Sequence, residues 1–280
     1  MQQFLRLSRL VLLGAVLLNF DAARAAEGAI APEVVYFQSQ GLELAGELFK
    51  PKGDGPFPAV LYNHGSAPGM LNSQASASIG PLFAAKGWAF FMPYRRGQGL
   101  SAKAGAYIGD EIAQARTRGG RQEAAATLVR LMETDHLQDQ LAALQWLQSQ
   151  KFVQKNRIAV AGNSFGGVQA VLGASRAPYC AAVDAAGGAE SWNDAPELQA
   201  LMKAAVQTSR APILFFQAEN DYDVAPSKTL FAVMKAAGKE AELKIYPPYG
   251  LSDREGHSFA YKGSAVWFAD VLAFVHLHCN

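Results

Sequence analysis

The sequence predicts an α/β fold with a mostly parallel central sheet, helices on both faces and an antiparallel N-terminal hairpin. Short, almost continuously apolar runs alternate along the chain with stretches of helical periodicity, a pattern typical of parallel strands buried on both faces. The first two strand-like segments instead alternate apolar and polar residues around Gly41, which favours a hairpin. The 280 residues are 50% hydrophobic and 18% charged, which fits one domain of roughly 250 residues.

The elements are expected in the following order. The hairpin is expected over residues 34–38 and 42–49. Apolar runs predict the remaining strands at residues 59–62, 88–92, 158–161, 181–183, 213–216 and 243–246. Helical periodicity predicts helices near residues 74–86, 137–149, 165–174, 196–208, 227–237 and 264–277.

One connection, residues 100–135, is longer than the others. Its helical pattern over residues 113–133 is interrupted by the pair Gly119 and Gly120. Long connections in compact domains often form lids or binding loops. The segment is therefore expected to be a lid beside a binding site, or else an insertion without that role.

The N-terminal 25 residues have the features of a signal peptide. Two arginines precede an apolar run at residues 10–18, and an Ala-x-Ala pattern follows at residues 23–25. The apolar run is shorter than the roughly 20 residues that cross a bilayer, although an uncleaved anchor is the alternative. We expect residues 1–25 to be cleaved off as a signal peptide. The remaining domain, residues 26–280, is then expected to be exported, periplasmic or secreted, without a stable membrane anchor.

The charge and the motifs of the chain argue against several kinds of partner and ligand. The net charge is +1 and no dense Lys/Arg run occurs, so nucleic acid and anionic lipid are not expected partners. Residues 97–102 fit a G-x-G-x-x-A pattern but lack the immediate helix and the acidic residue of a dinucleotide site, so no cofactor is expected. No metal is expected either, because His276 and His278 would not share a helix face.

The chain has two cysteines. Export permits a disulfide between Cys180 and Cys279, but two thiols alone do not establish one.

Residues 162–166 read Gly-Asn-Ser-Phe-Gly and lie between an expected strand and an expected helix. A nucleophile on such a turn has a strained backbone, and small flanking residues let the strand and the helix approach closely. Chance can supply this five-residue pattern in a glycine-rich chain, so its position between strand and helix carries the inference. Ser164 is therefore the expected nucleophile.

A serine hydroxyl needs a general base to act as a nucleophile. With the serine on a strand-to-helix turn of this kind, an acid and then a histidine follow it along the chain. His257 is expected in the loop that leaves the last strand, whereas His276 and His278 lie at the end of the final helix. His257 is therefore the expected base.

The orienting acid is expected in the turn after the strand at residues 213–216. It must accept a hydrogen bond from the imidazole and hold its tautomer. Three carboxylates compete for this role, namely those of Glu219, Asp221 and Asp223. Their chemistry alone does not rank Asp221 above Asp223.

Together these motifs resemble the dienelactone-hydrolase and prolyl-oligopeptidase-like branch of the α/β-hydrolases, over roughly residues 45–275. The resemblance rests on residues 62–66 (Tyr-Asn-His-Gly-Ser), 94–99 (Tyr-Arg-Arg-Gly-Gln-Gly), 162–166, 218–224 and 256–259 (Gly-His-Ser-Phe). The acid turn of that branch reads G-x-x-D-x-x-V, which matches here with Ala218 in place of the glycine and selects Asp221. True dienelactone hydrolases carry a cysteine where this chain has Ser164.

The resemblance also implies where the oxyanion is bound. It places two backbone N–H donors at Phe165 and Ser66 and leaves His64 with a structural role. Independently of the resemblance, Trp192 follows the strand expected at residues 181–183, on the side where ligands bind. Trp192 is therefore expected either to line the substrate site or to fill the core.

The function implied by the resemblance is hydrolysis of small-molecule carboxylic esters by a serine hydrolase. Ser164 would form an acyl-enzyme, with His257 as base and Asp221 as orienting acid. A short-peptide or aminoacyl hydrolase with the same residues is the first alternative. A non-catalytic binding protein on the same fold is the second.

Overall fold

The computed structural model describes residues 31–66 and 74–280. Residues Pro32–Asn280 form one compact unit. The expected signal peptide lies outside the described residues, so its cleavage stays a prediction. No helix in the described part of the chain is long and apolar enough to cross a membrane.

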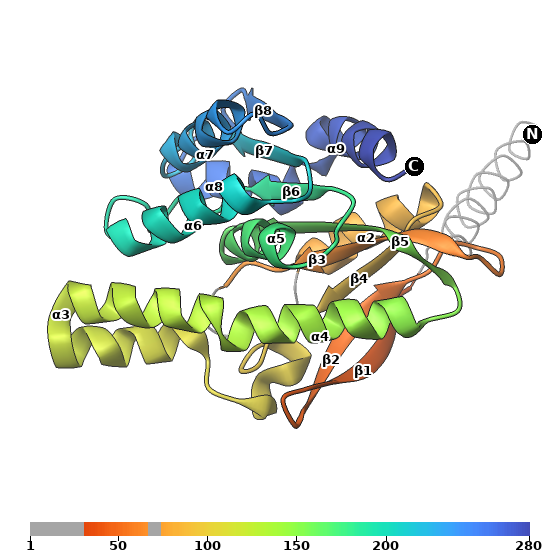
Figure 1. The fold of residues 1–280 in the computed structure, drawn as a ribbon, viewed down its shortest axis with the longest axis horizontal. Coiled ribbons are helices and arrows are strands. Elements are labelled where there is room, and N and C mark those ends of the chain that lie inside the picture. The colour runs from red at the N-terminus through yellow and green to blue at the C-terminus, as the bar shows by residue number, and fades with distance from the viewer. Residues whose placement is uncertain (1–30, 67–73) are drawn as a thin grey trace, which may run out of the picture. The chain divides into compact units, whose positions relative to one another are not determined.

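An eight-stranded sheet forms the centre of this unit (Figure 1), with the strand order β1-β2-β4-β3-β5-β6-β7-β8. The strands are β1 (Glu33–Ser39), β2 (Leu42–Phe49), β3 (Phe57–Asn63), β4 (Ala89–Pro93), β5 (Val153–Asn163), β6 (Ala182–Ala185), β7 (Ile213–Ala218) and β8 (Ala241–Tyr246). β2 pairs antiparallel with β1 and with β4, and the other neighbours are parallel. The predicted mostly parallel sheet with an antiparallel hairpin is confirmed.

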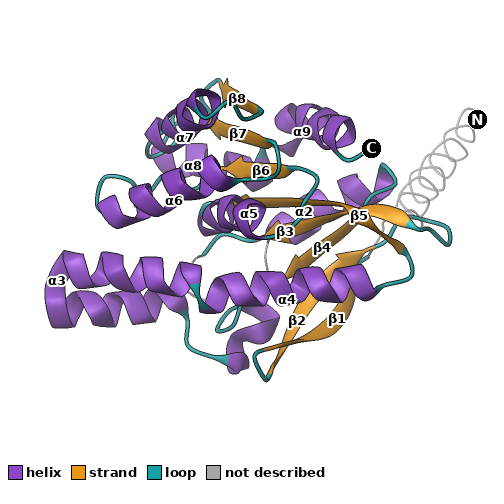
Figure 2. Ribbon diagram, viewed as in Figure 1, coloured by secondary structure: helices purple, strands orange, loops and turns teal. Residues whose placement is uncertain are grey.

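Helices cover both faces of the sheet (Figure 2). One face carries α4 (Asp135–Ser149), α5 (Phe165–Arg176), α6 (Pro196–Thr208) and α7 (Ala225–Ala236). The other carries α2 (Gln74–Ala85), α8 (Asp253–Lys262) and α9 (Ser264–His278). Between these layers, β4 and β7 are buried along their whole length, as the apolar runs at residues 88–92 and 213–216 predict. Trp267 on α9 is also buried.

The long connection forms a short 3-10 helix, η1 (Gly99–Ala104), and the helical hairpin α3 (Ile108–Glu133). The hairpin reverses at Gly119 and Gly120, whose backbone angles are not helical, and its two arms lie side by side (Figure 1). Gly120 has a φ of 72°, which glycine adopts without steric cost. The interruption expected from these two glycines is confirmed.

A disulfide joins Cys180 to Cys279, with their Cα atoms 5.0 Å apart. This answers the question that the cysteine content left open. The bond ties the segment before β6 to the end of α9 across a sequence separation of 99 residues. Cross-linking positions so far apart restricts the unfolded chain and thereby stabilises the folded one.

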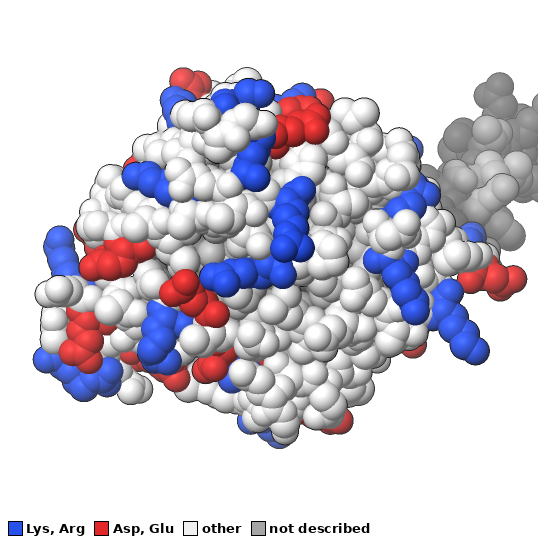
Figure 3. Space-filling view, viewed as in Figure 1, with Lys and Arg blue, Asp and Glu red and all other residues white. Residues whose placement is uncertain are grey.

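Charged residues of both signs are interspersed on the face of the molecule seen in Figure 3. No dense basic patch occurs on that face, in keeping with the formal net charge of +1. A nucleic-acid or anionic-lipid surface would need concentrated positive charge.

Candidate active site

Ser164 occupies a tight turn between the end of β5 and the start of α5. Its backbone angles are φ 55° and ψ −121°, a conformation that typically costs a non-glycine residue about 1–3 kcal/mol. Its N–H donates to the carbonyl of Ala185 on the neighbouring strand end at 2.9 Å. The strand–turn–helix context predicted for this serine is therefore present.

Two glycines allow the turn to close. A Cβ added at Gly162 would lie 2.1 Å from the Gly166 carbonyl oxygen, and one at Gly166 would lie 1.9 Å from that of Asn63. Asn63 is the last residue of β3, so these contacts press β5, α5 and β3 together at the turn. Any side chain at either position would push the serine turn away from the sheet edge.

The N-terminus of α5 leaves a hydrogen-bond donor beside the Ser164 hydroxyl. Within the described ranges, the Phe165 N–H has no acceptor. The first N–H groups of a helix carry partial positive charge, which favours an anion at this position. The geometry therefore suits the role that the resemblance assigned to Phe165.

Ser66, the second expected oxyanion donor, is held by a buried arginine that the sequence had not singled out. Arg95 donates to the carbonyl oxygens of His64 at 2.6 Å and Gly65 at 3.0 Å, and to the Ser66 hydroxyl at 3.0 Å. A fourth bond, to the Gln169 side chain at 2.9 Å, anchors the guanidinium to α5. Arg95 thus connects the segment at 64–66 to the helix that follows the serine turn.

The environment of His64 does not suit a general base. Burial lowers its pKa well below the ordinary value, and the positive charge of Arg95 lowers it further. Burial lowers the pKa of Arg95 itself to about 9, so the guanidinium stays charged at neutral pH. His64 is therefore neutral, and its contacts agree with the structural role expected of it.

His257 lies in the first half of α8 and not in a loop, so the expected loop position is wrong. A capping box of Ser252 and Glu255 begins the helix: the Ser252 hydroxyl accepts from the Glu255 N–H at 3.2 Å, and the Glu255 carboxylate accepts from the Ser252 N–H at 3.1 Å. This S-x-x-E signal was present in the sequence. At Gly256 a Cβ would lie 2.5 Å from the Asn220 carbonyl oxygen, so glycine lets α8 approach the acid turn.

The acid turn brings Asp221, and not Asp223, to this histidine. The distance from His257 Nδ1 to Asp221 Oδ1 is 2.8 Å, and the same oxygen accepts from the Tyr222 N–H at 2.7 Å. Asp223 instead accepts from the N–H of Ala225, the first residue of α7, at 2.7 Å. Glu219, the third competitor, is exposed.

This pairing sets the protonation properties of His257. Burial lowers the pKa of the imidazole, but the hydrogen bond and charge of Asp221 outweigh it, and Glu190 adds to them, so the net shift is upward. Because a carboxylate only accepts, Nδ1 donates to Asp221 and Nε2 is left with the lone pair. No hydrogen bond joins Nε2 to the Ser164 hydroxyl in the described part of the chain; such bonds often form only when substrate binds.

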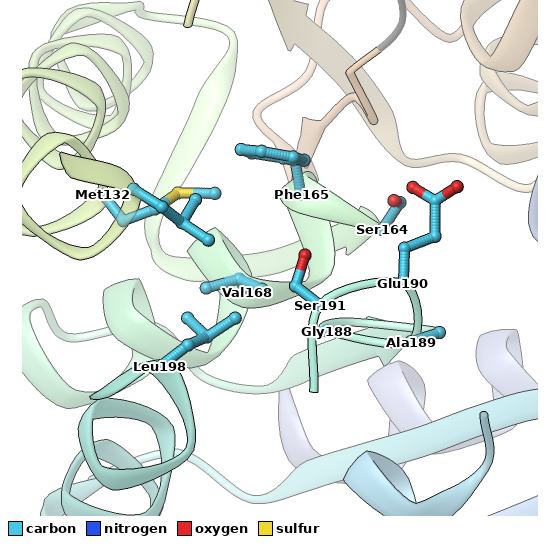
Figure 4. Close-up of a pocket in the computed structure, with 10 residues that line it drawn as sticks. Met132, Ser164, Phe165, Val168, Gly188, Ala189, Glu190, Ser191 and Leu198 are labelled. Carbon is cyan, nitrogen blue, oxygen red and sulfur yellow. The ribbon is translucent and has the colours of Figure 1, made fainter. Parts of the chain in front are cut away.

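A pocket opens at Ser164 (Figure 4). Its described lining is Leu128, Met132, Ser164, Phe165, Val168, Gly188, Ala189, Glu190, Ser191 and Leu198. Leu128 and Met132 come from the second arm of α3, so the long connection supplies part of the pocket wall. Trp192 is buried in the hydrophobic core and does not line this pocket.

No group of three metal-ligating side chains occurs among residues 31–66 and 74–280.

A buried carboxyl, that of Asp184, contacts two glycines that adjoin residues of the pocket wall. Its Oδ1 accepts from the Gly187 N–H at 2.7 Å, and a Cβ added at Gly167 would lie 2.3 Å from the same oxygen. Asp184 therefore packs between the start of α5 and the turn that leads into Gly188 and Glu190. Burial raises the pKa of Asp184 to about 7. Sequence reasoning missed this residue because it resembles any other polar position at a strand end.

Asp184→Asn is expected to change the pH dependence of stability. The folded-state pKa of about 7 lies above the ordinary 3.8, so the native protein binds this proton more tightly than the unfolded chain does. The resulting stabilisation is fully present below about pH 4 and is lost as pH rises through about 7. Asparagine keeps an acceptor for Gly187 and cannot ionise. The free energy of unfolding of the Asp184→Asn protein, measured relative to that of wild type, should therefore rise with pH, by at most about 1.4 kcal/mol per pH unit.

Urea unfolding at several pH values between about 5 and 8 measures this difference. Asp54→Asn, at an exposed carboxyl, is the matched control and should show no such trend. Parallel pH profiles for Asp184→Asn and wild type would contradict the expectation.

Comparisons with known proteins agree with this architecture. The dienelactone hydrolase family matches the sequence over residues 44–271. No curated protein matches the chain significantly in sequence. Many solved structures share its fold.

Three of these structures illustrate the likeness. Pyrococcus horikoshii acylaminoacyl peptidase is 19% identical with a TM-score of 0.64, covering 90% of this chain and 43% of its own. A Mycobacterium tuberculosis puromycin-hydrolyzing peptidase is 18% identical with a TM-score of 0.65, covering 89% and 39%. A Pyrococcus furiosus esterase is 14% identical with a TM-score of 0.64, covering 91% and 96%. The chain thus spans less than half the length of the two peptidases, and the likeness establishes an α/β-hydrolase fold.

Proposed function

Because the chain belongs to the dienelactone hydrolase family and has an α/β-hydrolase fold, we propose that it is a serine hydrolase acting on small-molecule carboxylic esters. One observation carries the proposal: Ser164 keeps a left-handed backbone conformation at the wall of the pocket. Strained backbone of this kind is concentrated at functional sites, and here it presents the hydroxyl to a ligand. The hydrogen-bonded pair of His257 and Asp221 supports the same reading.

The proposed mechanism is acyl transfer through the serine. Ser164 Oγ attacks the ester carbonyl carbon while His257 Nε2 takes the hydroxyl proton, and Asp221 stabilises the imidazolium that forms. The N–H groups of Phe165 and Ser66 donate to the tetrahedral oxyanion. The bond from carbon to the leaving oxygen then breaks, and the imidazolium gives its proton to the departing alcohol. Water, deprotonated by His257, cleaves the acyl-enzyme, releasing the acid and restoring the serine.

A short-peptide or aminoacyl hydrolase is the second candidate function. The same residues would cleave an amide, and two of the structures similar to this chain are named as peptidases. The carboxylate of Glu190 in the pocket favours this candidate, because it provides a contact for a substrate amine.

We also propose that the protein acts outside the cytoplasm, which the Cys180–Cys279 disulfide supports.

Two measurements on wild-type protein test the proposed function. p-Nitrophenyl esters of graded acyl length are expected to be hydrolysed, with aminoacyl p-nitroanilides assayed alongside as the amide comparison. A fluorophosphonate probe is expected to label Ser164, which peptide mass spectrometry locates. Absence of both hydrolysis and labelling would leave the non-catalytic binding protein as the better reading.

A further inference from the structure

The pocket at Ser164 has two chemically different parts. Figure 4 shows Glu190 and Ser164 on one side, and Met132, Val168 and Leu198 on the other. A substrate whose carbonyl carbon lies at the serine would therefore have an acidic group close to its reacting centre. The rest of its acyl chain would meet an apolar wall.

Glu190 is the single charged side chain among the described residues that line the pocket. It has no ion-pair or hydrogen-bond partner within the described ranges. Arg121 of the α3 hairpin pairs with Asp194 at 3.6 Å and not with Glu190. The Glu190 carboxylate is thus available to a ligand.

The surroundings of Glu190 add to its negative potential. The carboxylate of Asp221 lies behind His257, which is neutral when it acts as a base. Burial and the charge of Glu190 raise the pKa of Tyr107 and of Tyr222, while Arg95 opposes the shift at Tyr107 and Arg254 opposes it at Tyr222; the net shift is upward for both, so both hydroxyls stay uncharged at neutral pH. Arg95 is buried and bonded to the carbonyl oxygens of His64 and Gly65, and neither Arg95 nor Arg254 is among the described residues that line the pocket, so the described lining offers no positive charge to a substrate carboxylate. The site favours a cation and disfavours an anion beside the reacting carbonyl.

We propose that Glu190 determines specificity by binding a protonated amine that the substrate carries next to its reacting carbonyl. Combined with the apolar wall, this selects aminoacyl compounds with a free α-amino group and an apolar side chain. The inference rests on the proposed function of Ser164 and names the substrate class of the same site. Formation and hydrolysis of the aminoacyl-enzyme follow the acyl transfer already described, with the ammonium taking no part in bond making.

Three ethyl esters that share one carbon skeleton in the acyl chain and differ at the α-position test the proposal at neutral pH. L-Leucine ethyl ester carries the ammonium, 4-methylpentanoic acid ethyl ester lacks it, and N-acetyl-L-leucine ethyl ester replaces it with a neutral amide. Wild type is expected to show a higher kcat/KM for the leucine ester than for either of the others. In Glu190→Gln, this preference should fall about five- to tenfold, the effect of one unit charge at contact distance in a largely aqueous environment.

Glu197→Gln is the matched control, because it removes an exposed carboxylate of α6 that does not line the pocket. It should leave the preference for the leucine ester as it is in wild type. Raising the salt concentration should weaken the preference in wild type more than in Glu190→Gln, since the ionic contact is screened.

The outcomes separate the two proposals. If wild type cleaves the two neutral esters at least as well as the leucine ester, or if Glu190→Gln leaves the preference unchanged, the substrate class is wrong while the serine hydrolase stands. If wild type cleaves none of the three and a fluorophosphonate fails to label Ser164, the proposed function fails and the substrate class with it.

Discussion

Ser164→Ala is expected to lower kcat for the best p-nitrophenyl ester by about 10⁴- to 10⁶-fold. Without the hydroxyl no acyl-enzyme forms, and only binding and the oxyanion donors remain to accelerate attack by water. The loss should appear in kcat far more than in KM, because the pocket wall is unchanged. Steady-state kinetics of the purified variant, with active-site titration of the wild type, measures it.

The folded structure should survive this substitution. Alanine keeps the Cβ at a φ of 55°, so the backbone strain at position 164 is retained and the thermal midpoint should stay close to that of wild type. Ser175→Ala, near the other end of α5, is the matched control and should retain ester hydrolysis. A Ser164→Ala protein as active as wild type would place the nucleophile elsewhere and refute the mechanism.

The sequence predicted those parts of the fold that depend on local pattern. The buried strands β4 and β7 are built on continuous apolar runs at residues 89–92 and 213–216, and the α3 hairpin is marked by its paired glycines. α8 was missed because its sequence is largely polar, although its few apolar positions recur at helical spacing. Its capping box was the available signal.

Residues that act through long-range contacts were harder to find. Arg95 lies within a motif quoted for the resemblance, yet its role follows from carbonyl groups about 30 positions earlier in the chain. Asp184 is significant because the fold buries it, and Glu190 because the fold directs it into the pocket with Ser164. Sequence spacing contains no information on either point. Asp221 was selected over Asp223 by resemblance, and the geometry gives the physical reason: only Asp221 contacts the imidazole.

Asp221→Asn is expected to lower kcat by about 10⁴-fold, whereas Asp223→Asn should retain activity within about threefold. Asparagine has the size of aspartate but cannot stabilise an imidazolium. Its amide nitrogen, placed against Nδ1, would also favour the tautomer with the proton on Nε2, which is unable to accept the serine proton. At position 223, asparagine keeps the oxygen that accepts from Ala225, so the start of α7 is preserved.

The pH profile distinguishes this role of Asp221 from a purely structural one. In wild type the Asp221 hydrogen bond and charge raise the pKa of His257 against the effect of burial. Removing them leaves burial dominant, so the pKa of the base falls. Because the base acts only when neutral, the acidic limb of kcat/KM in Asp221→Asn should move to lower pH, although the plateau is far lower. Asp223→Asn should keep the wild-type limb. If Asp223→Asn loses activity and shifts the limb while Asp221→Asn does neither, the two aspartates must exchange roles, and the bond between His257 and Asp221 is structural.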